Sequence, residues 1–236
     1  MISAPKHRAE VNPYSRWIYD HPSHLLAEPT PEFLAEKRAQ ADALPVNQPS
    51  PQAGEPPRLM VELGSGSGNF LLQLGQLWPQ DHLVGFELRY KRLVKSAQKL
   101  ERAGLNRVWL LREQAERFPR YFTPGSVDRV YLNFPDPWPK RHQWKKRLVH
   151  PPFLEGLEQA LQPGGRFLLK TDHSGYFLHC IAQFEGRKGW KIVGFSNDLH
   201  RCTLTEPYPR TEFEQLFTSR RKVIYHLAMQ WQGNRT

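Results

Sequence analysis

Short apolar blocks alternate with amphipathic stretches along most of the chain, beginning at residue 58. Five blocks are continuous and rich in Leu, Val and Phe, as in strands buried on both faces: 58–63, 82–87, 108–111, 127–132 and 166–171. Four stretches have helical spacing: 69–78, 90–103, 153–161 and 174–184. Two last strands, 190–196 and 222–229, form a hairpin-like pair. The pattern predicts an α/β fold with a single doubly wound, mostly parallel, seven-stranded sheet and helices on both faces.

The first 57 residues differ from the rest in composition, because they hold ten of the 21 prolines. One helix is predicted there, at 31–44, with Thr30 as its N-cap and Pro31 in its first turn. The composition of 46–57 is typical of a linker. We therefore expect a Pro-rich N-terminal arm at 1–57 and one domain at 58–236. Within that domain, Pro163-Gly164-Gly165 is expected to stop the helix at 153–161.

The charge balance favours a polyanionic partner. Lys and Arg number 33 against 23 Asp and Glu, a formal net charge of +10, which makes nucleic acid a plausible ligand. The basic residues gather in three segments, each beside the same expected end of the sheet: 89–99, 140–147 and 220–222. No apolar run approaches the ~20 residues that span a bilayer, and no signal-peptide core follows the first charges. We expect a cytoplasmic protein without membrane contact.

Cysteine and histidine spacing does not indicate a metal site. Cys180 and Cys202 form no CxxC pair, which fits a reducing compartment and argues against structural zinc. His142, His150 and His173 are scattered, with no second ligand at metal-binding spacing. We therefore predict no metal.

The first two predicted strands end in residues suited to an adenosine-bearing cofactor. Glu62 precedes a turn in which Gly64, Gly66 and Gly68 allow close approach of a ligand to the backbone. Glu87 follows the second strand, where an acid can accept both hydrogen bonds of a ribose diol. A carboxylate at Glu62 would repel a diphosphate and suits a cationic amino-acid end instead. A P-loop is excluded because no Lys-Ser or Lys-Thr follows the glycines.

A proline-rich loop follows the fourth strand, at 133–140. Its three prolines remove backbone donors and fix φ, so the chain leaves the sheet as a stiff extended loop: Pro135, Pro137 and Pro139. The loop carries Asn133, Asp136, Phe134 and Trp138, with a basic run behind it. This combination suits a flat heterocycle beside an anionic backbone. A Pro-rich surface turn, with Trp138 wedged beneath it, is the alternative interpretation.

Five stretches, in order over residues 58–230, carry a family resemblance: Val61-Glu-Leu-Gly-Ser-Gly-Ser-Gly-Asn-Phe, Gly85-Phe-Glu-Leu, Asn133-Phe-Pro-Asp-Pro-Trp-Pro-Lys, Lys170-Thr-Asp-His-Ser-Gly-Tyr and Tyr208-Pro-Arg-Thr-Glu-Phe-Glu. Together they resemble the tRNA (guanine-N7)-methyltransferases, which modify a guanine in the tRNA variable loop. The most specific part is Phe-Pro-Asp-Pro-Trp-Pro-Lys. The resemblance implies a Rossmann-like class I methyltransferase fold, S-adenosylmethionine as cofactor and tRNA as substrate.

The same resemblance implies roles for individual residues. Asp136 would be catalytic, and the cofactor contacts would be Glu62, Gly64, Gly66, Gly68, Glu87, Gln114 and Asp136. The substrate contacts would be Lys140, Asp172, Thr211, Glu212, Phe213 and Glu214. Gln114 stands where the family usually has an acid for the adenine amino group, with Glu113 beside it. Its carbonyl can still accept that hydrogen bond.

Guanine N7 carries an in-plane lone pair and no proton, so methyl transfer to it needs alignment and charge placement rather than a general base. Our hypothesis is that Asp136 orients the guanine through its amino and imino hydrogens. A turn carboxylate that bonds backbone amides is the alternative. Lys140 would hold phosphate or guanine O6, and Lys145, Lys146 and Arg147 would contribute to tRNA binding, unless they form a solvated loop.

Two substrate assignments have structural alternatives. Asp172 could seat the base or could N-cap the helix that begins at Ser174. Thr211 and Glu214 have the spacing of a capping box. Two other classes of protein are the alternatives, and the sequence argues against both. A small-molecule or protein methyltransferase has no reason for a basic, aromatic loop after the fourth strand, and a non-catalytic RNA-binding module has no use for a cofactor pocket. The sequence leaves open the set of tRNAs, the role of residues 1–57, and the choice between monomer and homodimer.

Overall fold

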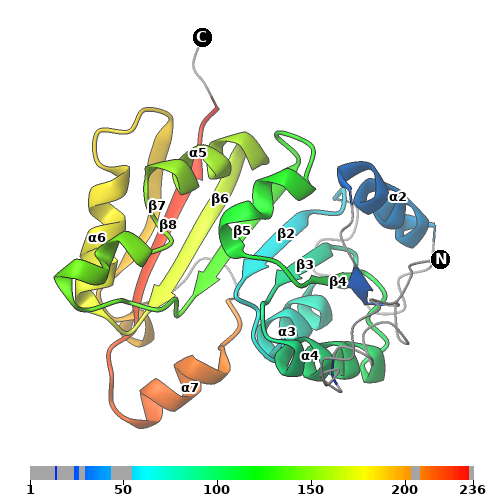
Figure 1. Ribbon diagram of the computed structural model, residues 1–236, viewed down its shortest axis with the longest axis horizontal. Helices are drawn as coiled ribbons and strands as arrows, with labels where there is room; N and C mark the ends of the chain where they lie inside the picture. The colour runs from blue at the N-terminus through cyan, green and yellow to red at the C-terminus, as the bar shows by residue number, and fades with distance from the viewer. Residues whose placement is uncertain (1–13, 15–23, 27–29, 44–54, 203–207, 234–236) are drawn as a thin grey trace, which may run out of the picture.

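The computed structural model describes residues 14, 24–26, 30–43, 55–202 and 208–233. Its strands form one sheet in the order β1-β4-β3-β2-β5-β6-β8-β7 (Figure 1). The strands are β1 (Leu25–Leu26), β2 (Leu59–Leu63), β3 (His82–Phe86), β4 (Val108–Leu111), β5 (Val127–Asn133), β6 (Leu161–Thr171), β7 (Trp190–Ser196) and β8 (Tyr225–Trp231). β8 runs antiparallel to β6 and β7, and the other pairs are parallel. The predicted seven-stranded, mostly parallel sheet is confirmed. β1, a two-residue addition beside β4, was not predicted.

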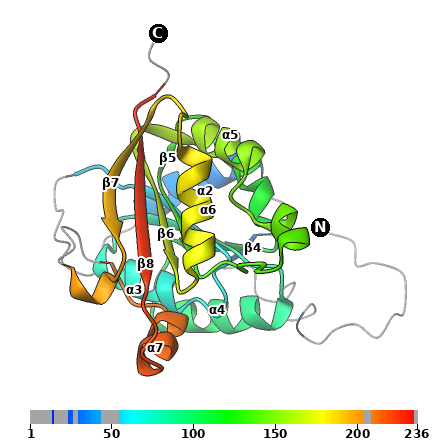
Figure 2. The ribbon, with the colours of Figure 1, turned by 90° about the vertical axis from the view of Figure 1, so that its left-hand side faces the viewer.

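Helices cover both faces of this sheet, as predicted. The α-helices are α2 (Pro31–Asp42), α3 (Asn69–Leu77), α4 (Tyr90–Arg102), α5 (Pro151–Ala160), α6 (Ser174–Phe184) and α7 (Glu212–Ser219), and the 3-10 helices are η1 (Ala115–Tyr121), η2 (Arg141–Lys146) and η3 (Leu199–Arg201). Met60 of β2 packs in a core with α3 and α4, whereas Val61 packs in a second core with α2, η1, α5 and α6. Alternate residues of a strand point to opposite faces, so α3 and α6 lie on opposite sides of the sheet (Figure 2).

The predicted N-terminal helix is present. The Thr30 hydroxyl accepts from Phe33 N at 3.2 Å, and Pro31 opens α2. Leu34 and Ala41 of α2 are buried in the same core as α5 and α6, so this part of the arm packs against the sheet. Most of the predicted linker at 46–57 lies outside the described residues.

One prediction about this fold was wrong. Helix α5 ends at Ala160 and β6 begins at once with Leu161, so Pro163-Gly164-Gly165 lies inside a strand rather than after a helix. The ladder tolerates this insertion because Leu161 pairs with Val127 and the next β5 pairing is Arg129 with Arg166, a register shift. The extra residues of a bulge make no ladder hydrogen bonds. Pro163, which has no backbone N–H, therefore costs the sheet no hydrogen bond.

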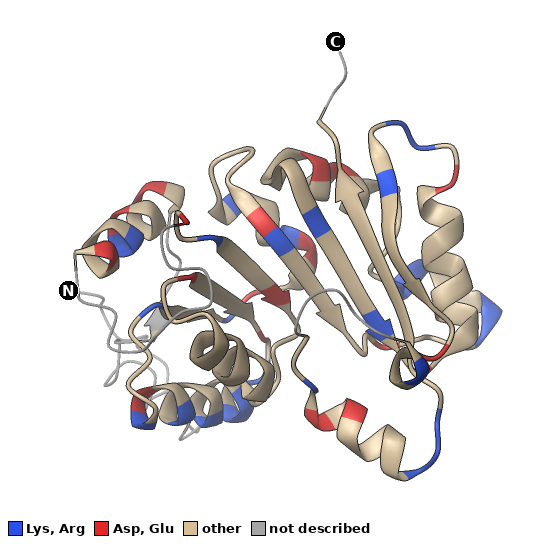
Figure 3. Cartoon of the chain, turned by 180° about the vertical axis from the view of Figure 1, so that it is seen from behind, with Lys and Arg blue, Asp and Glu red and all other residues tan. Residues whose placement is uncertain are grey.

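The basic segments lie at one end of the sheet, where β2, β3, β5 and β6 finish. Residues 89–99 open and continue α4 after β3, residues 140–147 follow β5, and residues 220–222 precede the antiparallel β8. Figure 3 shows the row of Lys and Arg along α4. Strand order reverses between β2 and β5, and this reversal marks where ligands bind in open α/β sheets.

Candidate functional site

A cavity of about 490 Å³ opens where strand order reverses. Its lining comes from the ends of β2, β3 and β5, from the loops after β4 and β5, and from α7: Leu63, Gly64, Phe86, Glu87, Leu88, Arg89, Arg92, Glu113, Ala115, Glu116, Leu132, Asn133, Phe134, Pro135, Asp136, Trp138, Lys146, Leu148 and Phe213. The predicted cofactor acid Glu87 and the predicted catalytic Asp136 therefore face one space. Its volume suits a nucleoside-sized ligand.

The glycine turn has the backbone that the sequence predicted. Gly64, Gly66 and Gly68 have φ of 77°, 57° and 76°, values that favour glycine. Glu87 supports the turn, because its carboxylate accepts from Gly66 N at 3.1 Å and from Arg89 N at 2.9 Å. Gly68 is also needed for packing, since a Cβ there would lie 2.0 Å from Ser96 Oγ on α4. The turn and the acid are thus joined by a hydrogen bond, and Gly64 and Glu87 both line the cavity.

Glu62 lies beneath this turn with only 3% of its surface exposed. Its Oε1 accepts from Asn133 Nδ2 at 3.1 Å, and its Oε2 is buried with no hydrogen-bond partner among the described residues. The pKa of Glu62 is raised to about 8, chiefly by burial; Asn133 and Lys170 lower it, and the nearby Glu87 raises it. Glu62 is therefore mostly protonated at neutral pH, and a ligand cation beside Oε2 would favour the carboxylate.

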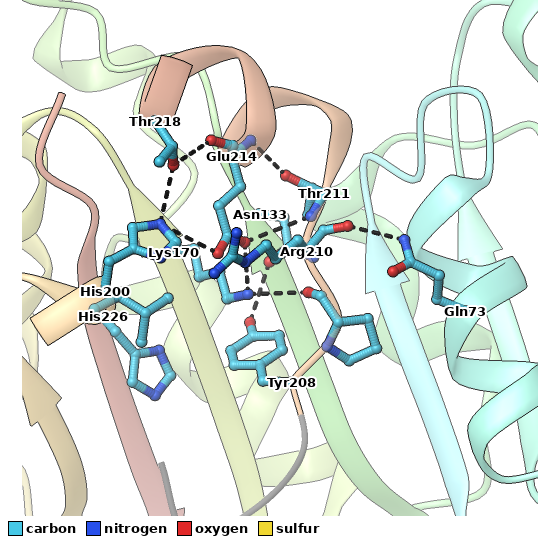
Figure 4. A network of polar contacts seen from close by, with 12 residues as sticks. Gln73, Asn133, Lys170, His200, Tyr208, Arg210, Thr211, Glu214, Thr218 and His226 are labelled. Atoms are coloured by element: carbon cyan, nitrogen blue, oxygen red, sulfur yellow. Dashed lines mark hydrogen bonds and ion pairs between the residues drawn. The ribbon is translucent and has the colours of Figure 1, made fainter. Parts of the chain in front are cut away.

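Asn133, which donates to Glu62, begins a chain of polar contacts that leads to Glu214 on α7 (Figure 4). The Tyr208 hydroxyl donates to Asn133 Oδ1 at 3.1 Å, and burial raises the pKa of this phenol well above its ordinary value. Lys170 Nζ lies 3.5 Å from the centre of the Tyr208 ring and donates to Glu214 Oε2 at 2.8 Å. Burial lowers the pKa of Lys170 to about 8, although Glu214 favours its charged form. Sequence reasoning did not assign Tyr208 or Lys170, although both open stretches that carry the family resemblance.

Thr211 and Glu214 form the capping box that their spacing allowed. The Thr211 hydroxyl accepts from Glu214 N at 3.0 Å, and Glu214 Oε2 accepts from Thr211 N at 3.4 Å. Both residues are buried, whereas Glu212 and Phe213 between them are exposed. Phe213 lines the large cavity. This segment thus has two buried residues that fix α7 and two accessible ones.

The proline loop is held in a strained backbone. Phe134 and Trp138 have φ of 50° and 41°, a region that non-glycine residues rarely adopt outside functional sites. Arg147 holds this shape, because its guanidinium donates to Pro137 O at 3.0 Å and to Gly175 O at 3.4 Å. Arg147 is only 3% exposed. The prediction that Arg147 contributes to a phosphate-binding run is therefore corrected: its side chain is occupied inside the fold.

Asp136 is the exposed acid at the tip of this loop. Within the described part of the chain its carboxylate makes no hydrogen bond, so it does not cap the backbone of its own turn, which was the alternative interpretation. Trp138 lines the cavity with it, and Lys146 Nζ lies 4.6 Å from the Trp138 ring. An unpaired carboxylate beside an aromatic face can position a planar base.

The loop after β4 presents Glu113 to the cavity, while Gln114 is exposed and lies outside its lining. The Glu113 carboxylate accepts from Gln114 N at 2.7 Å and from the Tyr121 hydroxyl at 2.8 Å. Burial alone would raise the pKa of Glu113, but these bonds and the nearby Arg117 and Arg120 lower it overall. An anionic acid thus stands near the position where sequence reasoning placed an amide.

Two further predicted substrate residues are at the same end of the sheet. Asp172 does not cap α6, because the cap is His173, whose Nδ1 accepts from Tyr176 N at 3.0 Å. Asp172 instead accepts from Lys222 Nζ at 2.6 Å. Lys140 is exposed at the start of η2, outside the cavity lining. Among the described residues, no cluster of His, Cys, Asp and Glu could hold a metal ion. No helix of the described chain is long and apolar enough to cross a bilayer.

Comparison with known proteins places this chain in a family. The model of a family described as "Putative methyltransferase" matches residues 57–227. The tRNA (guanine-N(7)-)-methyltransferase of Levilactobacillus brevis is 30% identical over 96% of this chain and 99% of its own length. A bifunctional glycosyltransferase/methyltransferase of Fusobacterium nucleatum is 29% identical over 89% of the chain, which spans 31% of that longer protein.

Solved structures support the fold. The 16S rRNA methyltransferase KamB superposes with a TM-score of 0.61 at 16% identity, over 87% of this chain and 95% of its own. At this identity the likeness shows the shared class I methyltransferase architecture.

Proposed function

The chain belongs to the tRNA (guanine-N7)-methyltransferase family, and we propose that it transfers a methyl group from S-adenosylmethionine to N7 of a guanine in the variable loop of tRNA. The observation that carries this proposal is the shared cavity. Glu87, at the end of β3, and Asp136, on the loop after β5, line one space of about 490 Å³. A donor held by the first acid and a base held by the second can therefore meet.

The residues of the site fit the cofactor. Glu62 Oε2 is buried and without a partner among the described residues, so it suits the ammonium group of a methionine end. Glu87 has the position and lone pairs to accept from a ribose diol. Glu113 lines the same cavity and can accept from the adenine amino group. We assign that contact to Glu113. Gln114 supports it, because the Gln114 backbone N–H donates to the Glu113 carboxylate.

When bound, S-adenosylmethionine supplies an electrophilic methyl group on a sulfonium. The chain's own residues then provide alignment, since N7 attacks through an in-plane lone pair and needs no base. Asp136 accepts from the guanine amino and imino hydrogens and offsets the positive charge that develops on the purine. Its exposed, unpaired carboxylate is consistent with that role. Trp138 offers a face beside it, and Arg147 keeps the strained loop in place.

The tRNA backbone would lie over the basic segments beside the cavity. Lys140, Lys145 and Lys146 are exposed and available to phosphates. Asp172, with Lys222, and the accessible Glu212 and Phe213 are proposed to contact the nucleotides next to the target guanine. We also propose that the chain acts in the cytoplasm, because its proposed substrate is tRNA.

A labelling experiment tests this proposal against a small-molecule or protein methyltransferase. The purified chain and methyl-tritiated S-adenosylmethionine are incubated in three separate reactions. One contains unmodified bulk tRNA, one a protein extract and one a metabolite extract. Label should enter the tRNA alone. Label in protein or in small molecules would reject the proposed substrate, and failure to bind S-adenosylmethionine at all would reject the methyltransferase site.

A further inference from the structure

Three donors from two helices and the glycine turn meet at one carboxylate, that of Glu212 on α7. Ser67 Oγ donates to Glu212 Oε2 at 2.7 Å. Asn69 Nδ2, in the first turn of α3, donates to Glu212 Oε1. Lys99 Nζ, on α4, lies 3.5 Å from the same oxygen and also donates to Asn69 Oδ1. We call Ser67, Asn69 and Lys99 the donor cluster.

The stability of α7 does not account for this arrangement. Thr211 and Glu214 already cap the helix through a complete capping box, so Glu212 is not needed there. The Glu212 side chain is 51% exposed and that of Lys99 is 32% exposed, and ion pairs this accessible contribute little to folding. The donor cluster also stands at the start of α3, whose N-cap is Gly68 and makes no side-chain capping bond. A helix start of this kind attracts anions.

A second observation points to a ligand at this place. The donor residues Ser67 and Asn69, together with Glu212, line a small recess of about 40 Å³ that also includes Glu62. Glu62 is 3% exposed, and its Oε2 is buried without a partner among the described residues. One wall of the recess thus offers an acceptor for a cation, and another already holds a carboxylate. An ammonium and a carboxylate on one carbon atom form the α-amino-acid zwitterion.

We propose that the donor cluster binds the α-carboxylate of the cofactor's methionine end, and that Glu212 occupies this position when the cofactor is absent. This inference rests on the proposed function. Glu212 already accepts from the donors that the carboxylate would need. Glu212 must therefore leave them before the carboxylate can bind, and its departure also enlarges the recess of about 40 Å³. The released Glu212 is then available to the tRNA.

Competition of this kind lowers the apparent affinity for the cofactor, because only the fraction of molecules with an open cluster can bind it. Removing the Glu212 carboxylate should therefore strengthen binding. Removing the charge of Lys99 should weaken it. Both effects should vanish for a ligand that keeps the adenosine but has no amino-acid end.

Isothermal titration calorimetry with two ligands tests this proposal without turnover. S-adenosylhomocysteine carries the α-carboxylate, whereas 5′-methylthioadenosine lacks the whole amino-acid end. For S-adenosylhomocysteine, Glu212→Ala should lower Kd by roughly threefold to tenfold and Lys99→Met should raise it by about tenfold. For 5′-methylthioadenosine, both variants should match the wild-type chain. Glu101→Ala, an exposed acid on α4 without a described partner, is the matched control for loss of one negative charge.

The outcomes separate the inference from the proposed function. Weaker or unchanged binding of S-adenosylhomocysteine by Glu212→Ala would overturn the competition, since Glu212 would then hold the ligand or ignore it. Equal effects on both ligands would overturn the carboxylate assignment. If the wild-type chain bound neither ligand, the proposed function itself would fail, and this inference with it.

Discussion

Asn133 Nδ2 donates to Glu62 Oε1 over 3.1 Å and so joins the last residue of β5 to the last residue but one of β2. These parallel neighbours stand where strand order reverses. The bond satisfies one oxygen of Glu62 and leaves the other unpaired and buried among the described residues. The site therefore contains a carboxyl group that has been taken out of water before any ligand arrives.

The buried Glu62 predicts a pH dependence of stability. Its pKa rises from 4.5 to about 8 on folding, chiefly through burial. The folded chain therefore holds a proton that the unfolded chain releases, so this contribution to stability is complete below pH 4.5 and is lost progressively up to about pH 8. Relative to Glu62→Gln, the wild-type free energy of unfolding should fall by at most ~5 kcal/mol across that window. Denaturant melts from pH 5 to 9 measure it, and parallel curves would argue against the raised pKa.

The buried pair of Lys170 and Glu214 predicts a large stability loss from a single change. Lys170→Met leaves the Glu214 carboxylate buried without its cation, which should cost about 3–5 kcal/mol. The double variant Lys170→Met/Glu214→Leu should recover most of this, because no lone charge remains. Lys222→Met breaks the ion pair between Lys222 and Asp172. Because the Lys222 side chain is 48% exposed, the free energy of unfolding should fall by under about 1 kcal/mol. A double variant no more stable than Lys170→Met would contradict this account.

In the basic loop, we expect Lys145 and Lys146 to contribute to tRNA binding and Arg147 to contribute to stability. Lys145→Gln/Lys146→Gln should reduce the slope of log affinity for tRNA against log salt by about 1–2, with the fold unchanged. Arg147→Met should instead lower the free energy of unfolding by about 2–4 kcal/mol, because it removes a buried guanidinium that binds two carbonyls. Salt-dependent binding and denaturant melts on both variants decide this. If Arg147→Met reduced the salt dependence of tRNA affinity without lowering the free energy of unfolding, Arg147 would instead be a tRNA contact.

We expect Asp136 to be needed for methyl transfer but not for cofactor binding. Asp136→Asn keeps the shape of the loop but removes the charge that faces the developing positive purine, so methyl transfer should fall by at least ~100-fold. The Kd for S-adenosylhomocysteine should change less than about threefold. Single-turnover transfer and calorimetry measure the two quantities. Unaltered transfer with weakened cofactor binding would assign Asp136 to the cofactor alone.

The sequence predicted the sheet well because its strands are continuous apolar blocks and its functional turns need glycine or proline whatever surrounds them. It failed where tertiary packing decides. Arg147 resembles its basic neighbours in sequence, yet the strained loop buries it. Gly164 and its neighbours suggested a helix stop, but the ladder between β5 and β6 absorbs them as a bulge.

At several positions the sequence could not predict which way a side chain points. Glu113 and Gln114 are adjacent, and only the path of the chain after β4 determines which lines the cavity. The spacing of Thr211 and Glu214 fitted both a cap and a substrate contact, and only the structure shows that the two residues form the capping box. The donor cluster around Glu212 joins residues more than 100 positions apart, so no local pattern could have indicated it.

The central claim is that the acid-lined cavity aligns a methyl donor with guanine N7 of tRNA. The most direct measurement treats unmodified tRNA transcripts with the chain and S-adenosylmethionine, and then maps strand cleavage at N7-methylguanine. Our account predicts cleavage at one guanine of the variable loop, absent with Asp136→Asn. Methylation at another atom or outside tRNA, or cleavage that persists undiminished in Asp136→Asn, would contradict it.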